Sequence, residues 1–266
     1  MRHFLFAALL AFSFSSQIYG QSYTKQQETL PCLNKKFTIV AHIFKDSLGD
    51  YGVTEQNINQ SIEEMNGFFK PICVSFEVCK FLYHDNFQHD TLDKDTETAE
   101  ITTKYNVDYR INVYYMTHLA PPGINFDVAG LASLNGIAQA AGGSFVFVEK
   151  ATLGAIHHEM GHFFNLKHTF EGNGTELVNG SNCLTAGDGL CDTPADPFVE
   201  GDPLTLYLDM ANDCRFISQK QDANSEYYNP DVGNIMSYYN CGPSGFSWGQ
   251  LNRMAQAYLA SDMKYW

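Results

Sequence analysis

Residues 157–168 read HHEMGHFFNLKH and hold four of the nine histidines of the chain together with one glutamate. On an α-helix, residues four positions apart lie on one face, so His158 and His162 would present their imidazoles side by side. Two imidazoles so placed can clamp a zinc ion, which accepts neutral ring nitrogens at about 2.0 to 2.1 Å. Glu159 would face a zinc-bound water, whose proton a carboxylate can pass to a leaving amine. His157 would point away from this pair, and we interpret it as structural.

A third metal ligand is available in His168, six residues beyond His162. If the helix stops near Asn165, the chain can turn back there, because asparagine tolerates a positive φ better than the other residues except glycine. Two alternatives remain open. The stretch would also suit a histidine-rich surface helix without a metal, or a zinc site in which a distant glutamate replaces His168.

The composition indicates a globular protein that does not bind nucleic acid. The chain has 266 residues, of which 44% are hydrophobic, enough to bury a sizeable core. Acidic residues outnumber basic ones by 30 to 16, which gives a formal net charge of -14, and no lysine or arginine cluster occurs. Nucleic acid is therefore not an expected partner.

The start of the chain has the pattern of a signal peptide. A short basic start precedes an apolar run over residues 4–14 and a small polar run that ends at Gly20. We expect cleavage near Gly20 and secretion of the mature protein. No later run of about 18 apolar residues follows, so we expect no membrane anchor. Seven cysteines fit an oxidising compartment.

The first half of the chain predicts a mixed sheet backed by helices. Apolar or alternating runs predict strands over residues 37–44, 74–83, 110–116 and 144–148. Ile58, Ile62, Met65 and Phe69 recur at helical spacing and predict a helix that backs the sheet. The helix that carries the histidines follows the last of these strands. Strands that alternate with helices in this way are typical of a mixed sheet.

The second half is predicted to be rich in loops. Gly, Asn, Asp and Pro are frequent over residues 171–234, with little periodicity. Four of the seven cysteines lie in this half, namely Cys183, Cys191, Cys214 and Cys241. Their presence favours disulfide cross-links in this long loop-rich segment. A final helix is expected over residues 248–259. We expect a signal peptide over 1–20, a short lead or pro-segment over 21–36 and a catalytic domain over 37–266, itself divided after residue 168.

The histidine stretch resembles the zinc signature of the metzincins, H-E-x-x-H-x-x-G-x-x-H, with Asn165 in place of the glycine. Within this group the chain is similar to the pappalysin family, also called cytophagalysins, which includes ulilysin-like bacterial proteases. Four further stretches carry the similarity: HTFEG (168–172), GDGLCDTPADP (187–197), NIMSYY (234–239) and FSWGQLNRM (246–254).

The resemblance implies roles for several residues. Met236 would lie beneath the zinc as the methionine of the Met-turn, and Tyr238 would stabilise the oxyanion of the tetrahedral intermediate. The loop 187–197 would bind calcium as a structural ion through Asp188 and Thr193, and with less support through Asp192 and Asp196. Without the resemblance, Met236 would suit a methionine of the core, and Tyr238 would suit a buried tyrosine with a satisfied hydroxyl. The loop 187–197 would suit a turn in which aspartates cap backbone amides.

The cysteines leave several pairings open, since four cysteines allow three connectivities. The resemblance implies Cys183–Cys214 and Cys191–Cys241. Cys73 and Cys79 flank a predicted strand and could pair across a bend. Cys32 is then left over in the lead, where its thiolate could bind the zinc and hold a precursor latent.

Together these observations predict an α+β, zincin-like (metzincin) fold with a loop-rich, disulfide-linked lower subdomain. The predicted function is that of a secreted zinc metalloendopeptidase in which Glu159 activates the zinc-bound water. Its partners would be protein or peptide substrates, and we expect a monomer. A catalytically silent extracellular binding module, stabilised by zinc and calcium, is the alternative. Glu159 favours the enzyme, because a purely structural zinc site needs only ligands.

Overall fold

The computed structural model describes residues 29–93, 96–119, 128–139 and 144–262. A five-stranded sheet has the order β2-β1-β4-β7-β6. Its strands are β1 (Lys35–Phe44), β2 (Val74–His84), β4 (Ile111–Met116), β6 (Gly130–Ala132) and β7 (Val146–Glu149). The first four strands of this order are parallel, whereas β6 runs antiparallel to β7 at the edge. The predicted signal peptide lies outside the described residues.

Three helices contribute to the main core on one face of the sheet: α1 (Glu55–Phe69), α3 (Ile156–Phe163) and α4 (Trp248–Ala260). Thr54 caps α1 by accepting a hydrogen bond from the Asn57 amide, and Ile58, Ile62, Met65 and Phe69 are buried, as the helical spacing predicts. The second core forms on the other face around Phe44, Tyr114 and Phe147. The fold is therefore α+β with a mixed sheet, as predicted.

The remaining elements of the first half are short. They are α2 (Thr98–Tyr105), β3 (Thr91–Leu92), β5 (His118–Leu119) and the 3-10 helices Lys70–Ile72, Phe87–Asp90, Gly136–Ala138 and Leu153–Ala155. The predicted strands and helices are all present with small shifts at their ends. The edge strand β6 and helix α2 were not predicted.

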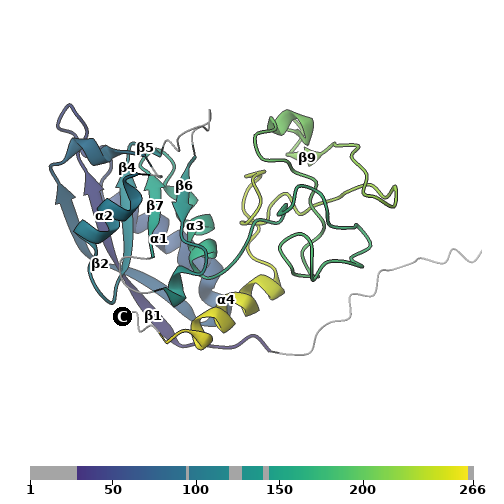
Figure 1. Cartoon of the computed structure of the whole chain (residues 1–266), viewed down its shortest axis with the longest axis horizontal. Coiled ribbons are helices and arrows are strands. Elements are labelled where there is room, and N and C mark those ends of the chain that lie inside the picture. Colours follow the sequence, from purple (N-terminus) through teal and green to yellow (C-terminus); the bar gives the residue numbers. More distant parts are fainter. Residues whose placement is uncertain (1–28, 94–95, 120–127, 140–143, 263–266) are drawn as a thin grey trace, which may run out of the picture.

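The loop-rich second half lies beside the sheet-containing half, and α4 returns from it to the main core (Figure 1). Leu251, Met254 and Ala255 of α4 are buried in that core. Apart from α4, the named elements in the described part of the second half are the 3-10 helix Leu204–Leu206 and the hairpin β8 (Leu208–Asp209) with β9 (Arg215–Phe216), around a small aromatic core. The division into two subdomains after residue 168 stays a proposal. No helix within the described ranges is long and apolar enough to cross a membrane.

The disulfides predicted for the second half are wrong. Cys183 pairs with Cys191, and Cys214 pairs with Cys241. Turns between residues 182 and 189 bring the Cα atoms of the first pair within 5.0 Å of each other. The Cα atoms of the second pair lie 5.7 Å apart, which ties the β8–β9 hairpin to the segment after Tyr239. Sequence spacing alone does not reveal either approach.

The pair Cys73–Cys79 is wrong as well, and so is the latency role of Cys32, because Cys32 forms a disulfide with Cys73. The lead runs beside the start of β2, where the amide of Leu33 donates to the carbonyl of Ile72. Six residues along a strand span about 20 Å, too far for a disulfide between Cys73 and Cys79. Cys79 is exposed and not in a disulfide, at a break in the β1–β2 register.

Candidate metal centre

Three histidines converge on one point. The Nε2 atoms of His158, His162 and His168 lie 3.0 to 3.1 Å from one another. Tetrahedral ligands about 2.05 Å from a zinc ion lie about 3.3 Å apart, close to this spacing. Within the described parts of the chain, no other group of three histidine, cysteine, aspartate or glutamate side chains brings its ligand atoms this close. The donor set therefore fits a single zinc ion.

The end of α3 brings His168 back to the other two histidines. Asn165 has a φ of 73°, the left-handed conformation that the predicted turn requires. Its amide donates to the carbonyl of His162, and the amide of Leu166 donates to the carbonyl of Gly161. These two hydrogen bonds form a Schellman motif, which ends the helix and reverses the chain. Asparagine thus adopts here the left-handed conformation that glycine most readily takes.

The protonation of the histidines suits metal binding. The Nδ1 atoms of His158 and His162 each lie 2.7 Å from a carbonyl oxygen, that of Ile235 and that of Leu166 respectively. Because a carbonyl only accepts, each Nδ1 carries the proton and each Nε2 keeps a free lone pair. Burial lowers the pKa of His158 to about 3 and that of His168 to about 2, and it also lowers the pKa of His162. The rings are therefore neutral at physiological pH.

Glu159 lies on the same turn of α3, with 5% of its surface exposed. Burial raises the pKa of its carboxyl group to about 8. A cation held by the neighbouring histidines would favour the ionised form. His157, in contrast, is turned toward α1, where its Nε2 lies 3.3 Å from the carbonyl oxygen of Ser61. This position agrees with the structural role predicted for His157.

Met236 is fully buried directly against α3. A Cβ atom added to Gly161, between the two helical histidines, would overlap the Met236 sulfur. The turn that holds Met236 is fixed by Asn234, whose Oδ1 accepts a hydrogen bond from the Met236 amide. The side chains of Asn234 and Gln250 also pair through two amide hydrogen bonds of 2.9 and 3.1 Å. The contribution of Asn234 and Gln250 was not predicted, although S-x-x-Q at residues 247–250 marks a capping box.

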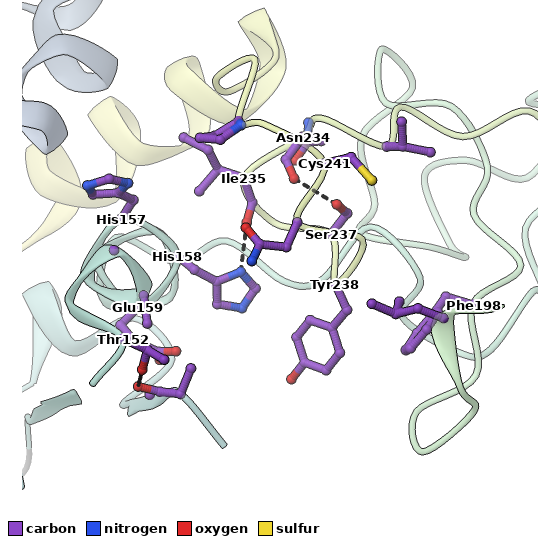
Figure 2. Close-up of a pocket in the computed structure, with 18 of the residues that line it drawn as sticks. Thr152, His157, His158, Glu159, Phe198, Asn234, Ile235, Ser237, Tyr238 and Cys241 are labelled. Atoms are coloured by element: carbon purple, nitrogen blue, oxygen red, sulfur yellow. Dashed lines mark hydrogen bonds between the residues drawn. The ribbon is translucent and has the colours of Figure 1, made fainter. Parts of the chain in front are cut away.

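Tyr238 stands beside the histidine cluster at the wall of a cleft of about 900 Å³. Its ring centroid lies 4.7 Å from that of His168 and 5.6 Å from that of His158. Burial, and to a lesser extent the charges of Glu200 and Glu159, raise the pKa of the Tyr238 hydroxyl, so it remains a hydrogen-bond donor. Figure 2 shows His158 and Glu159 of α3 on one side of the cleft and Tyr238 with Phe198 on the other.

The aspartates of loop 187–197 do not gather around one point. Asp192 is exposed and accepts a hydrogen bond from the Gly249 amide at the start of α4. Asp196 accepts hydrogen bonds from Thr169 and Tyr239. Thus both act as acceptors within the fold, and the prediction that they join a calcium site is not supported.

Asp188 and Thr193 do lie together, and the Thr193 hydroxyl donates to Asp188 Oδ1. Asp188 Oδ2 is buried without a hydrogen-bond partner among the described residues. Glu176, which was not predicted as a site residue, is buried nearby and contacts Gly187 closely enough to exclude a Cβ atom there. Burial raises the pKa of Glu176 to about 8 and that of Asp188 to about 6. No pattern in the sequence around Glu176 marks it as buried.

Comparison with solved structures gives distant similarities. Metalloproteinase-II from Bacteroides fragilis shares 9% identity over 54% of this chain and 46% of its own, with a TM-score of 0.39. Archaemetzincin from Methanopyrus kandleri shares 16% identity over 52% of this chain and 78% of its own, with a TM-score of 0.34. A chaperone–substrate complex shares 15% identity over 85% of this chain and 38% of its chain, with a TM-score of 0.39. No curated protein sequence matches the chain.

The match of the sequence to a family model assigns the chain to a protein family. Residues 102–259 match the M43 peptidase family, described as pregnancy-associated plasma protein-A. The match covers more than half of the chain and includes helix α3, His168, the turn at Met236 and most of α4. This chain therefore belongs to the M43 family of metzincin-type metallopeptidases.

Proposed function

We propose that the protein is a secreted zinc-dependent endopeptidase in which Glu159 acts as the general base. One observation carries the proposal: three neutral imidazole nitrogens lie 3.0 to 3.1 Å apart, and one of them belongs to His158, which lines a cleft next to the buried side chain of Glu159. A purely structural site would need no such carboxylate. Membership of the M43 family supports the same conclusion.

We assign each residue of the site a separate role in the reaction. His158, His162 and His168 would hold the zinc ion, which acidifies water and polarises a carbonyl group when bound. Glu159 would accept a proton from the attacking water and deliver it to the leaving amine. Tyr238 would donate a hydrogen bond to the oxyanion that develops at the scissile carbonyl.

The test is to measure zinc content and cleavage of an unbiased peptide library with protein that lacks residues 1–20. One zinc per chain together with cleavage inside peptides would support the endopeptidase. Zinc without any cleavage would contradict it and would instead support a binding module that has lost activity. The same library would reveal the side-chain preference of the cleft.

Replacing Tyr238 with phenylalanine should lower kcat by about 100-fold and change KM little, because the lost hydrogen bond forms mainly in the transition state. Zinc content should stay at one per chain, since Tyr238 is not one of the three nitrogen ligands. Tyr227→Phe, at a tyrosine with 59% of its surface exposed, is the matched control. A kcat within about twofold of the parent would argue against the oxyanion role.

Secretion is proposed from the signal-peptide pattern of residues 1–20, and the three disulfides are compatible with an extracellular location. Amino-terminal sequencing of the mature protein from the producing cells should begin near residue 21. A chain that still begins at Met1 would contradict the proposal.

We also propose that Asp188 and Thr193 bind a structural calcium ion, together with Glu176. The buried, unpartnered oxygen of Asp188 supports this, because calcium prefers several oxygen ligands that include carboxylates. The ion would compensate two carboxyl groups that burial otherwise makes unfavourable in their charged form.

This proposal predicts how stability depends on pH. With pKa values of about 8 for Glu176 and about 6 for Asp188, both raised in the folded state, the folded protein binds more protons than the unfolded chain. In calcium-free buffer with one equivalent of zinc, the free energy of unfolding should therefore fall between pH 5 and 8, by on the order of 5 kcal/mol. Calcium should remove this fall, as measured by thermal unfolding.

The variant Asp188→Asn provides the control for the calcium experiment. Because its amide is always neutral, it should be more stable than the parent in calcium-free buffer at pH 8, and it should respond less to calcium. Equal calcium responses of parent and variant would remove Asp188 from the proposed site.

A further inference from the structure

The edge strand β6 approaches the Glu159 side chain so closely that a Cβ atom at position 130 would overlap it. A Cβ atom added to Gly130 would lie 2.5 Å from Glu159 Oε1 and 2.7 Å from Cδ, with Cγ closer still. Real Cβ atoms essentially never come within 3.0 Å of a heavy atom of a residue that is not their neighbour in the chain. The backbone of Gly130 does not have the positive φ that favours glycine. Any side chain at position 130 would therefore require Glu159 or the strand to move.

The strand at this point is held firmly. Gly130 pairs with Val148 of β7, and the carbonyl of the preceding residue, Ala129, accepts a hydrogen bond of 2.9 Å from the Glu149 amide. Leu131 packs on the second core, whereas Ala132 packs on the main core that contains α3. Because side chains alternate along a strand, position 130 faces α3 as Ala132 does.

Glu159 has few other constraints. Within the described ranges its carboxylate forms no hydrogen bond, although only 5% of the residue is exposed. A buried carboxylate without hydrogen bonds takes its position from packing. The Gly130 backbone is one surface that the Glu159 side chain packs against, since a Cβ atom added there would overlap three Glu159 atoms.

We infer that Gly130 is a positioning residue: by lacking a side chain, it lets β6 fix the Glu159 carboxylate beside the histidine cluster. The catalytic consequence rests on the proposed function, whereas the contact between Gly130 and Glu159 does not. A methyl group at this position would push the carboxylate away from the place where it meets the attacking water. A displacement of about 1 Å at a catalytic group can lower a rate by about 100-fold.

The test is a double-mutant cycle of Gly130→Ala and Glu159→Ala, with Gly67→Ala as the matched control. Gly67 lies in α1 with no atom within 4 Å of an added Cβ, so the same exchange there meets nothing. In zinc-free protein, Gly130→Ala should lower Tm by about 5 °C in the parent and by less than about 1 °C in the Glu159→Ala background. Equal shifts in both backgrounds would overturn the inference.

The kinetic arm uses the zinc-loaded protein. Gly130→Ala should lower kcat by about 100-fold, leave KM within about threefold and keep one zinc per chain. An unchanged kcat would overturn the positioning role.

If the parent binds zinc but cleaves no peptide, the proposed function fails, while the Tm cycle still decides whether Gly130 positions Glu159. If Gly130→Ala does not fold, the double variant should, and failure of both would contradict the inference.

Discussion

Glu159→Gln is expected to lower kcat by about 100- to 10,000-fold while the protein keeps one zinc per chain. Glutamine has nearly the same shape as glutamate, so the packing against Gly130 and the histidine positions should persist. It cannot accept a proton from water, however, and the reaction would lose its general base. Peptide cleavage and metal content, measured on the same sample, check both parts of this result.

The fold of the Glu159→Gln variant should not be weakened. Burial raises the pKa of the Glu159 carboxyl to about 8, so a neutral amide suits this environment in zinc-free protein at least as well as a charge. Glu63→Gln, at an exposed position of α1, serves as the control. Turnover by Glu159→Gln near the parent rate would reject the mechanism.

His168→Ala should weaken zinc binding by more than about 100-fold and abolish cleavage. Loss of a residue that only supports a ligand typically costs 10- to 100-fold in metal affinity, so loss of a ligand should cost more. The His168 ring also stacks on Phe170, with centroids 4.7 Å apart, and has no obvious substitute nearby among the described residues. Competition with a chromogenic chelator measures the affinity.

His118→Ala is the matched control, because 59% of the His118 side chain is exposed and it lies in β5, outside the histidine cluster. If His168→Ala retained one tightly bound zinc, the third ligand would have to be another residue, such as a distant glutamate. The two outcomes therefore separate the metzincin arrangement from the alternative that the sequence left open.

Local sequence signals predicted the elements that carry the histidines. The i, i+4 spacing of His158 and His162 and the tolerance of Asn165 for positive φ both depend on a few adjacent residues, and the structure has α3 and its turn where they were expected. The buried strand β1 and helix α1 were equally clear from their periodicity. Such signals are strong because each depends on few other parts of the fold.

Features that depend on distant contacts were not predictable in the same way. Strand β6 is three residues long and begins with glycine, so it lacks both length and β propensity. The pairing of Cys32 with Cys73 depends on the lead running beside β2, which no local pattern indicates. The burial of Glu176 likewise follows from loop packing rather than from its neighbours in sequence.

The return of α4 to the main core has a consequence for the order of folding. The ring of Tyr258 in α4 meets that of Phe37 in β1 with centroids 5.2 Å apart, so the contact joins residues 221 positions apart. Contacts of such sequence separation form slowly, because the chain between them must first be brought together. Gln250 of the same helix holds the turn that carries Met236. We therefore expect the turn that carries Met236 to reach its final position only after α4 has packed against β1, so that zinc affinity would report on completed folding.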